Sequence, residues 1–197
     1  MTLESLQATA KAIFEDSARL KQEIADDSQN LLNLARMAEI SALCIQKGGK
    51  LMLCGNGGSA GDAQHITAEL LIRLRSDRDR AALPALCLTM DMSTLTACAN
   101  DYGFERVFER PLRALAKPGD VLIGFTTSGN SSNVICAMKA AQDLGVTVLG
   151  FLGGTGGEAL ALCETSFRAP NTMDPGRIQE THITAGHALV EMIEDSL

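Results

Sequence analysis

The apolar residues follow two different patterns along the chain. Over residues 4–25 and 31–46 they recur at helical spacing, as with Ile13, Leu20 and Ile24, which predicts two long helices with Asp27 or Ser28 as the cap between them. After residue 50 the pattern changes to short, continuously apolar runs separated by helical stretches. These runs are LMLC at 51–54, ALCLT at 85–89, VLIGFT at 121–126, VTVLGFLG at 146–153 and SFRAP at 166–170.

The alternation of apolar runs and helices predicts the fold class. A strand that is apolar at every position is buried on both faces, which is typical of a parallel sheet covered by helices on both sides. We therefore expect a three-layer α/β/α sandwich with a parallel sheet, preceded by two long N-terminal helices. Residues 1–197 are expected to form one domain, with 1–48 as a helical extension for oligomerisation. Further helices are expected from Ser59, through Ala116, over 132–144, near 158–163 and over 177–195.

Composition narrows the class of protein. Of 197 residues 46% are hydrophobic, which is enough for a buried core, so disorder is not expected. A formal net charge of -7 argues against nucleic-acid binding, because neutralising phosphates needs a surplus of Lys and Arg on some surface. Six widely spaced cysteines without a C-x-x-C pair favour free thiols in a reducing compartment. No signal peptide or membrane-spanning run is recognisable, so we expect a cytoplasmic protein.

Two of the predicted strands end in loops rich in glycine and hydroxyl side chains. LMLC continues into GNGGS, VLIGFT continues into TSGNSSN, and each loop leads into a helix. At the carboxyl ends of parallel strands, backbone N–H groups and helix N-termini bind anions, and Ser and Thr hydroxyls add donors. Either loop alone is also typical of a tight turn with Ser as N-cap. The two together favour a phosphate, and because neither matches a nucleotide-binding glycine motif, a nucleotide is not predicted.

The helix after the first loop carries groups suited to proton transfer. It reads GDAQHITAELLIRLR and places His65, Glu69 and Arg73 at intervals of four residues on one face, which we expect to be exposed. This stretch alone is also typical of an ordinary solvated helix. The C-terminal helix contains the other two histidines, His182 and His187. Three histidines on two helices next to predicted site loops, together with Glu69, point to metal binding or proton transfer.

Several ordered motifs together resemble one family. CGNGGS with D-A-x-H-x-x-x-E, then ACANDYGF, TTSGNSSNV and RIQETH followed by His187, are similar to the bacterial phosphoheptose isomerases, a branch of the sugar isomerase (SIS) domain proteins. The resemblance spans nearly the whole chain, including the two leading helices. It implies an SIS fold and an aldose-ketose isomerase that converts sedoheptulose 7-phosphate into D-glycero-D-manno-heptose 7-phosphate. That product feeds ADP-heptose and lipopolysaccharide core biosynthesis.

The resemblance also implies which residues bind the substrate. The first loop and the ANDYG segment would contact the sugar, and the second loop would form a phosphate cradle in which Thr126 stands where relatives often have Ser. Arg73 would add charge near the phosphate. Gly176 stands where relatives have an Asp, which puts a substrate contact from that position in doubt. The implied substrate-binding residues are Asn56, Gly57, Gly58, Ser59, Glu69, Arg73, Asn100, Asp101, Thr126, Thr127, Ser128, Ser131 and Gln179.

The same resemblance implies one Zn²⁺ ion per subunit, with His65, Glu69, Gln179 and His187 as ligands and with Glu69 and His187 as acid and base. Isomerisation through an enediol needs proton transfer at two neighbouring carbons and a group that polarises the carbonyl. Gln179 and His187 are eight residues apart, roughly 12 Å of helix rise. A bent helix start or ligands from a neighbouring subunit would bring them to one metal, and His182 is the alternative ligand.

Two further expectations concern assembly and the alternative function. The leading helices carry an apolar stripe that the sheet need not cover, and related proteins use this extension to form tetramers, so we expect a homotetramer with sites at subunit interfaces. A relative in the same superfamily is a non-enzymatic homotetramer that binds the replication initiator, and this is the alternative. That relative lacks acidic and imidazole groups at the positions of Glu69 and His187, which favours the enzyme here.

Overall fold

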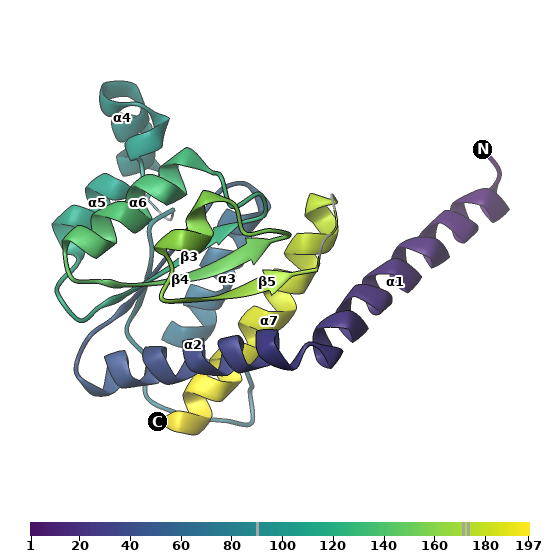
Figure 1. The fold of residues 1–197 in the computed structure, drawn as a ribbon, viewed down its shortest axis with the longest axis horizontal. Coiled ribbons are helices and arrows are strands. Elements are labelled where there is room, and N and C mark those ends of the chain that lie inside the picture. The colour runs from purple at the N-terminus through teal and green to yellow at the C-terminus, as the bar shows by residue number, and fades with distance from the viewer. Residues whose placement is uncertain (90, 171, 173) are drawn as a thin grey trace.

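Five parallel strands form the central sheet, in the order β2-β1-β3-β4-β5 (Figure 1). The computed structural model describes residues 1–197 with the exception of 90, 171 and 173. The sequence neighbours β1 and β2 are also neighbours in the sheet, and β3 pairs with the other side of β1. The strands are β1 (Leu51–Gly55), β2 (Ala85–Cys87), β3 (Val121–Thr126), β4 (Thr147–Gly153) and β5 (Thr165–Ala169).

Helices cover both faces of the sheet. α2, α3 and α7 pack on one face and α5 and α6 on the other (Figure 1). Alternate residues of a strand enter opposite layers, so that Leu53 belongs to the core under α3 and α7, whereas Met52 and Cys54 belong to the core under α6. The helices are α1 (Leu3–Asp26), α2 (Ser28–Gln46), α3 (Gly58–Leu71), α4 (Met92–Tyr102), α5 (Glu109–Leu115), α6 (Ser132–Asp143) and α7 (Pro175–Ser196), with 3₁₀ helices η1 (Phe104–Arg106) and η2 (Glu158–Leu162).

This architecture confirms the predicted fold class, a parallel α/β/α sandwich preceded by two long helices. Each of the five apolar runs forms a strand, and β3 covers the residues predicted for it. Asp27 is the N-cap of α2 and accepts a hydrogen bond from the Asn30 N–H at 3.0 Å. The helix expected near 158–163 is the short 3₁₀ helix η2.

One predicted helix ends earlier than expected. α3 stops at Leu71, so Arg73 lies beyond the helix and not one turn further along the face that carries Glu69. The guanidinium of Arg80 donates hydrogen bonds to the carbonyl oxygens of Glu69 and Leu70, at 2.8 and 2.9 Å. These contacts replace the N–H groups that a longer helix would have supplied. The prediction that Arg73 lies on the same helix face as Glu69 is therefore wrong.

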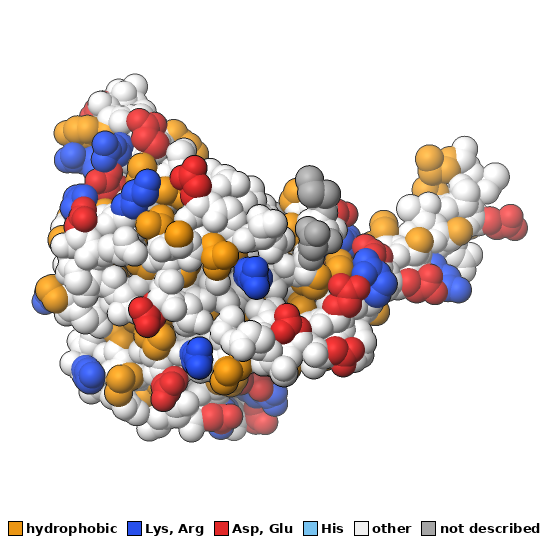
Figure 2. All heavy atoms as spheres, in the orientation of Figure 1, with side chains coloured by type: hydrophobic (Ala, Val, Ile, Leu, Met, Phe, Trp, Pro, Cys, Tyr) orange, Lys and Arg blue, Asp and Glu red, His pale blue; other side chains and the backbone are white. Residues whose placement is uncertain are grey.

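Helix α1 leaves much of its apolar surface uncovered. Its second half contacts α2 and α7, where Leu20 is buried and the Ser17 hydroxyl donates to Glu180 Oε2 at 2.7 Å. Its first half projects from the body of the molecule, with apolar side chains at the surface (Figures 1 and 2). We call its exposed apolar residues the α1 stripe; it consists of Leu3, Leu6, Ile13 and Phe14, of which Phe14 is the largest side chain and is 77% exposed.

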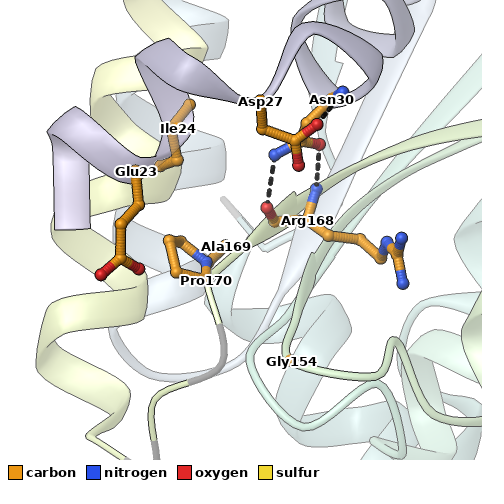
Figure 3. Close-up of a pocket in the computed structure, with 8 residues that line it drawn as sticks. All are labelled: Glu23, Ile24, Asp27, Asn30, Gly154, Arg168, Ala169 and Pro170. Carbon is orange, nitrogen blue, oxygen red and sulfur yellow. Dashed lines mark hydrogen bonds between the residues drawn. The ribbon is translucent and has the colours of Figure 1, made fainter.

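The start of α2 is tied to the edge strand β5 by one side chain. Asn30 Nδ2 donates to the Arg168 carbonyl oxygen at 2.7 Å, and the Arg168 N–H donates to Asn30 Oδ1 at 2.9 Å (Figure 3). The amide therefore takes the place of a neighbouring strand at the sheet edge. A cavity of about 300 Å³ lies beside this contact, and its lining does not include the loops that follow β1 and β3.

All six cysteines are free, as expected, and Cys44, Cys54, Cys87 and Cys98 are buried. Within the ranges that the structure describes, no helix combines the length and the apolar character needed to cross a lipid bilayer.

Candidate active site

The loops after β1 and β3 meet at the carboxyl edge of the sheet. The two strands pair in parallel register up to Gly55 and Phe125, so they end together. Beyond this point the side-chain amides of Asn56 and Asn133 form two reciprocal hydrogen bonds, in which each Nδ2 donates to the other Oδ1, at 2.7 and 2.8 Å. The strand order reverses between β1 and β3, and such a reversal is where open α/β sheets bind ligands.

The glycines of the first loop allow close packing. Gly57 has a φ of 56° directly before α3, and Gly58 is the first residue of that helix. A Cβ on Gly58 would lie 2.3 Å from Gln179 Oε1, so the end of the Gln179 side chain lies against the bare backbone of Gly58 and would have to move for any larger residue. Ser59 is buried in the first turn. The bare backbone that the sequence predicts for anion binding therefore also makes room for a side chain of α7.

The loop after β3 is held by its own hydroxyl groups. Thr126 Oγ1 lies 3.0 Å from Ser131 Oγ and accepts a hydrogen bond from the Gly129 N–H at 3.1 Å. Ser131 is the N-cap of α6, but its hydroxyl contacts Thr126 and does not cap the helix. Ser128 is exposed, Thr127 is half-buried and Thr126 is buried. A cavity of about 320 Å³ adjoins the loop and is lined by Thr127, Ser128, Gly153, Gly154, Thr155, Thr172, Pro175 and Ile178.

Three of the four predicted metal ligands come together between α3 and α7. Glu69 Oε1 lies 3.0 Å from His65 Nε2 and 3.4 Å from His187 Nε2. The two Nε2 atoms are 3.1 Å apart. The side chains of His65 and His187 are 53% and 40% exposed, whereas that of Glu69 is 9% exposed. We call these three residues the His-Glu-His cluster; its geometry suits a metal ion or the exchange of a proton.

Glu69 is the buried member of this cluster, so the expectation that it lies on an exposed face is wrong. Burial raises the pKa of Glu69 above its ordinary value, and the neighbouring His187 and His65 oppose that rise. Its Oε2 atom is buried without a hydrogen-bond partner in the described part of the chain. Buried carboxylate oxygens are normally hydrogen-bonded, so this atom is available to a ligand or an ion.

Gln179 lies at the other end of the same pair of helices. Its side chain contacts Gly58, which precedes His65 by seven residues, roughly 10 Å along α3. A Cβ on Gly186 would meet Ile66, so α3 and α7 run side by side in the same direction. Within one chain Gln179 is therefore two helical turns away from the His-Glu-His cluster. Its assignment as a ligand of the same metal stays a prediction.

His182 faces the core. It is fully buried, its Nε2 lies 3.0 Å from the Leu152 carbonyl oxygen, and its ring makes edge contacts with Phe125 and Phe151. Burial lowers the pKa of His182 to about 4, so the ring is neutral at pH 7. The alternative in which His182 replaces His187 as a metal ligand is therefore not supported.

Besides Glu69 and Gln179, three predicted substrate residues lie outside the two loops. Arg73 follows the C-terminal end of α3, whereas the first loop adjoins its N-terminal end, roughly 20 Å away for a helix of 14 residues. Asn100 and Asp101 are exposed on the last turn of α4, where Asn100 Nδ2 donates to Asp101 Oδ1 at 2.8 Å. α4 projects from the body (Figure 1). Near Gly176 the chain has a different carboxylate, since Asp174 caps α7 by accepting from the Gly176 N–H at 2.8 Å.

Two asparagines of the TSGNSSN loop hold the site together although the sequence pattern did not indicate them. Asn133 is the partner of Asn56 described above. Asn130 Oδ1 accepts from the Glu158 N–H at 3.0 Å and its Nδ2 donates to the Ser128 carbonyl oxygen at 3.0 Å, which ties this loop to the one after β4. The only sequence signal for these hydrogen bonds is that asparagine is common in turns, where its side chain bonds to nearby backbone groups.

The fold defines a parallel α/β protein whose candidate site lies at the carboxyl ends of its strands. The sequence profile of the SIS domain family matches residues 13–153, which is more than half of the chain. The chain belongs to the SIS domain family.

Its similar proteins include phosphoheptose isomerases. The chain is 48% identical to the phosphoheptose isomerase of Chlorobaculum parvum over 181 residues, which are 92% of this chain and 86% of that protein. The structure of a phosphoheptose isomerase from Francisella tularensis superposes with a TM-score of 0.90 at 35% identity, over 99% of this chain and 100% of that one. The phosphoheptose isomerase of Neisseria gonorrhoeae gives a TM-score of 0.86 at 41% identity, over 96% and 99%.

Proposed function

We propose that this chain is a phosphoheptose isomerase, which interconverts sedoheptulose 7-phosphate and D-glycero-D-manno-heptose 7-phosphate. The observation that carries the proposal is the His-Glu-His cluster, whose three atoms lie within 3.4 Å of one another on α3 and α7. α3 follows directly on the first strand-end loop. The names of the similar proteins described above support the substrate.

The reaction moves a proton between two neighbouring carbon atoms of the sugar. A base removes a proton from C1 of the ketose while the carbonyl oxygen at C2 gains a proton, which gives an enediol; an acid then returns a proton to C2 while the hydroxyl at C1 loses its proton and becomes the aldehyde. Glu69 and His187 serve as this base and acid. Burial raises the pKa of Glu69, which makes its carboxylate a stronger base than an exposed one, and Oε1 lies 3.4 Å from His187 Nε2. In the metal-free protein a proton can therefore pass between the two side chains.

The phosphate group is bound by the loop after β3 and the N-terminal end of α6. The hydroxyls of Thr127, Ser128 and Ser131 and the first N–H groups of the helix are donors, and the helix dipole favours a negative charge there. The cavity of about 320 Å³ beside Thr127 and Ser128 offers space for the substrate. Holding the phosphate fixes the sugar relative to the catalytic groups, which lowers the entropic part of the barrier.

The cluster fits a zinc ion, and we propose one per subunit. Zinc binds nitrogen and oxygen ligands at about 2.0–2.2 Å in tetrahedral sites, so two of its ligand atoms lie roughly 3.3 Å apart. The distances in the cluster are 3.0, 3.1 and 3.4 Å. His65, Glu69 and His187 would hold the ion, and Gln179 of a neighbouring subunit is the proposed fourth ligand. A bound zinc ion would supply positive charge that polarises the carbonyl oxygen of the sugar.

A homotetramer with sites at subunit interfaces is part of the proposal. The exposed α1 stripe supports assembly, because apolar surface of this extent is normally covered by a partner. In their own chain, Arg73 lies away from the two loops and Gln179 lies away from the His-Glu-His cluster, which supports a contribution from a neighbouring subunit. A cytoplasmic location and a place in ADP-heptose and lipopolysaccharide core synthesis complete the proposal.

The alternative of a non-enzymatic binding protein for the replication initiator is not supported. The chain has both Glu69 and His187, and the structure brings them into contact with His65. The relatives described above are named as isomerases.

The proposal is tested by incubating the purified protein with sedoheptulose 7-phosphate in D₂O and following the reaction by NMR. We expect the aldose to form and deuterium to appear at C2, because the proton passes through a side chain that exchanges with solvent. Absence of conversion both with and without added zinc would contradict the proposed activity.

A further inference from the structure

Asn133 is a buried polar residue at the start of α6, with 1% of its surface exposed. Its Oδ1 accepts hydrogen bonds from the Val134 N–H at 2.9 Å and from Asn56 Nδ2 at 2.7 Å. Its Nδ2 donates to Asn56 Oδ1 at 2.8 Å. The side chain therefore makes one bond within its own helix and two bonds to the loop after β1.

The two bonds fix both the loops and the Asn56 amide. A single hydrogen bond would leave the amide free to rotate, whereas a reciprocal pair determines which way its oxygen and its nitrogen point. An asparagine amide has two N–H donors and two lone pairs. Asn56 uses one of each on Asn133, so one N–H and one lone pair remain for a ligand.

We propose that Asn133 is a positioning residue, which acts on the bound sugar phosphate through Asn56. Its two hydrogen bonds hold the Asn56 amide ready for the substrate and set the spacing between the loop after β1 and the phosphate loop after β3. The inference rests on the proposed function, because Asn56 is one of the residues assigned there to the substrate. Without Asn133 the Asn56 amide has no fixed orientation, and substrate binding must order it at an entropic cost.

A double-mutant cycle tests this role. KM and kcat for sedoheptulose 7-phosphate are measured for the wild type, Asn133→Ala, Asn56→Ala and the double variant. We expect Asn133→Ala to raise KM roughly tenfold, as for the loss of two neutral hydrogen bonds, while kcat stays within about threefold. In the Asn56→Ala background the same substitution should change KM by less than about twofold, because its effect passes through Asn56.

Gln142→Ala is the matched control. The Gln142 Nε2 donates to the Leu162 carbonyl oxygen at 3.0 Å near the other end of α6, so this variant removes an amide hydrogen bond from the same helix away from the loops. Its KM should equal that of the wild type. Should Asn133→Ala not fold, the cycle is run with Asn133→Ser, which is neutral and cannot form the reciprocal pair of amide hydrogen bonds with Asn56. A rise in KM that disappears in the Asn56→Ala background supports the inference in either cycle.

Two results would overturn the inference. One is an unchanged KM in the Asn133 variant, and the other is an equal rise in both backgrounds, which would mean that Asn133 only supports α6. Calorimetric binding of sedoheptulose 7-phosphate gives the same cycle in Kd if turnover is absent. Wild-type protein that neither converts nor binds the sugar phosphate would contradict the proposed function together with this inference, whereas a failed cycle in an active enzyme contradicts the inference alone.

Discussion

The Nε2 atoms of His65 and His187 lie 3.1 Å apart although 122 residues separate them in the sequence. The contact joins the helix after the first strand to the last helix of the chain, and the buried carboxylate of Glu69 lies within reach of both rings. Two imidazole nitrogens at this distance either share a proton or direct both lone pairs at a cation. The first two predictions concern these two possibilities.

Glu69→Gln should lower the isomerase rate by about 100- to 10,000-fold, the usual contribution of a positioned general base. The substitution keeps the side-chain shape and removes a buried carboxylate, so the metal-free protein should unfold at the wild-type temperature or above it. Steady-state kinetics and thermal denaturation measure the two effects. Glu191→Gln is the control, because Glu191 lies one turn after His187 on α7 and pairs with Arg75, and this variant should retain full activity. A rate for Glu69→Gln within a few-fold of wild type would remove Glu69 as the base.

Zinc should bind with a stoichiometry of one ion per chain, and a chelator should lower the melting temperature, because a ligand that binds only the folded state stabilises it. His187→Ala should lose stoichiometric zinc, whereas His182→Gln, five residues earlier on α7, should keep it. Metal analysis of the dialysed proteins measures both. Equal zinc contents in the two variants would show that the His-Glu-His cluster does not hold the ion.

Phe14→Asp should shift the protein from a tetramer to smaller species, because it places a charge in the α1 stripe, where Phe14 is 77% exposed in the single chain. Ala8→Asp adds the same charge on the opposite side of α1, at 100° per residue, and should leave assembly unchanged. Light scattering at micromolar concentration distinguishes the two. A wild-type protein that is a stable monomer would rule out the assembly and also the proposed contribution of Gln179 from a neighbour.

His182 should make stability fall in mild acid. Its pKa is about 4 in the folded state, against an ordinary value of 6.5, so between these values the unfolded chain binds more protons than the folded chain. Stability due to this ring is complete above pH 6.5 and is lost as the pH falls towards 4, by about 3 kcal/mol at 1.36 kcal/mol per pKa unit. His182→Gln removes the titrating group. The free energy of unfolding in urea is measured at a series of pH values for the wild type and for His182→Gln. It should fall less steeply in the variant as the pH falls, and parallel curves would contradict the prediction.

The sheet was predictable because each strand carries its own signal. A run such as VLIGFT is apolar at every position, and only burial on both faces explains that pattern. The end of α3 was not predictable, since the helical spacing continues through Arg73 and the helix is ended by Arg80, whose guanidinium takes two of its carbonyl oxygens. Local patterns cannot reveal a cap supplied from outside the helix.

The candidate site, like the fold, could be predicted from the sequence only in part. Spacing places His65 and Glu69 together because they are one turn apart on one helix. The burial of His182 also had a signal, since it shares the helical spacing of Ile178, Ala185 and Leu189, all of them buried. The reciprocal bonds of Asn56 and Asn133 join residues 77 positions apart, and nothing in a single sequence connects them.

The pairing of β1 with β3, which aligns Leu51 with Val121, also governs when the site can exist during folding. The hydrogen bonds within α1 and α2 are local in sequence and can form early, whereas closing so long a segment between two strands is slow. The two strand-end loops meet only after that closure. During synthesis, α7 must also have emerged from the ribosome before His187 can reach Glu69. We therefore expect only the completely folded chain, and no partly folded form, to bind a sugar phosphate.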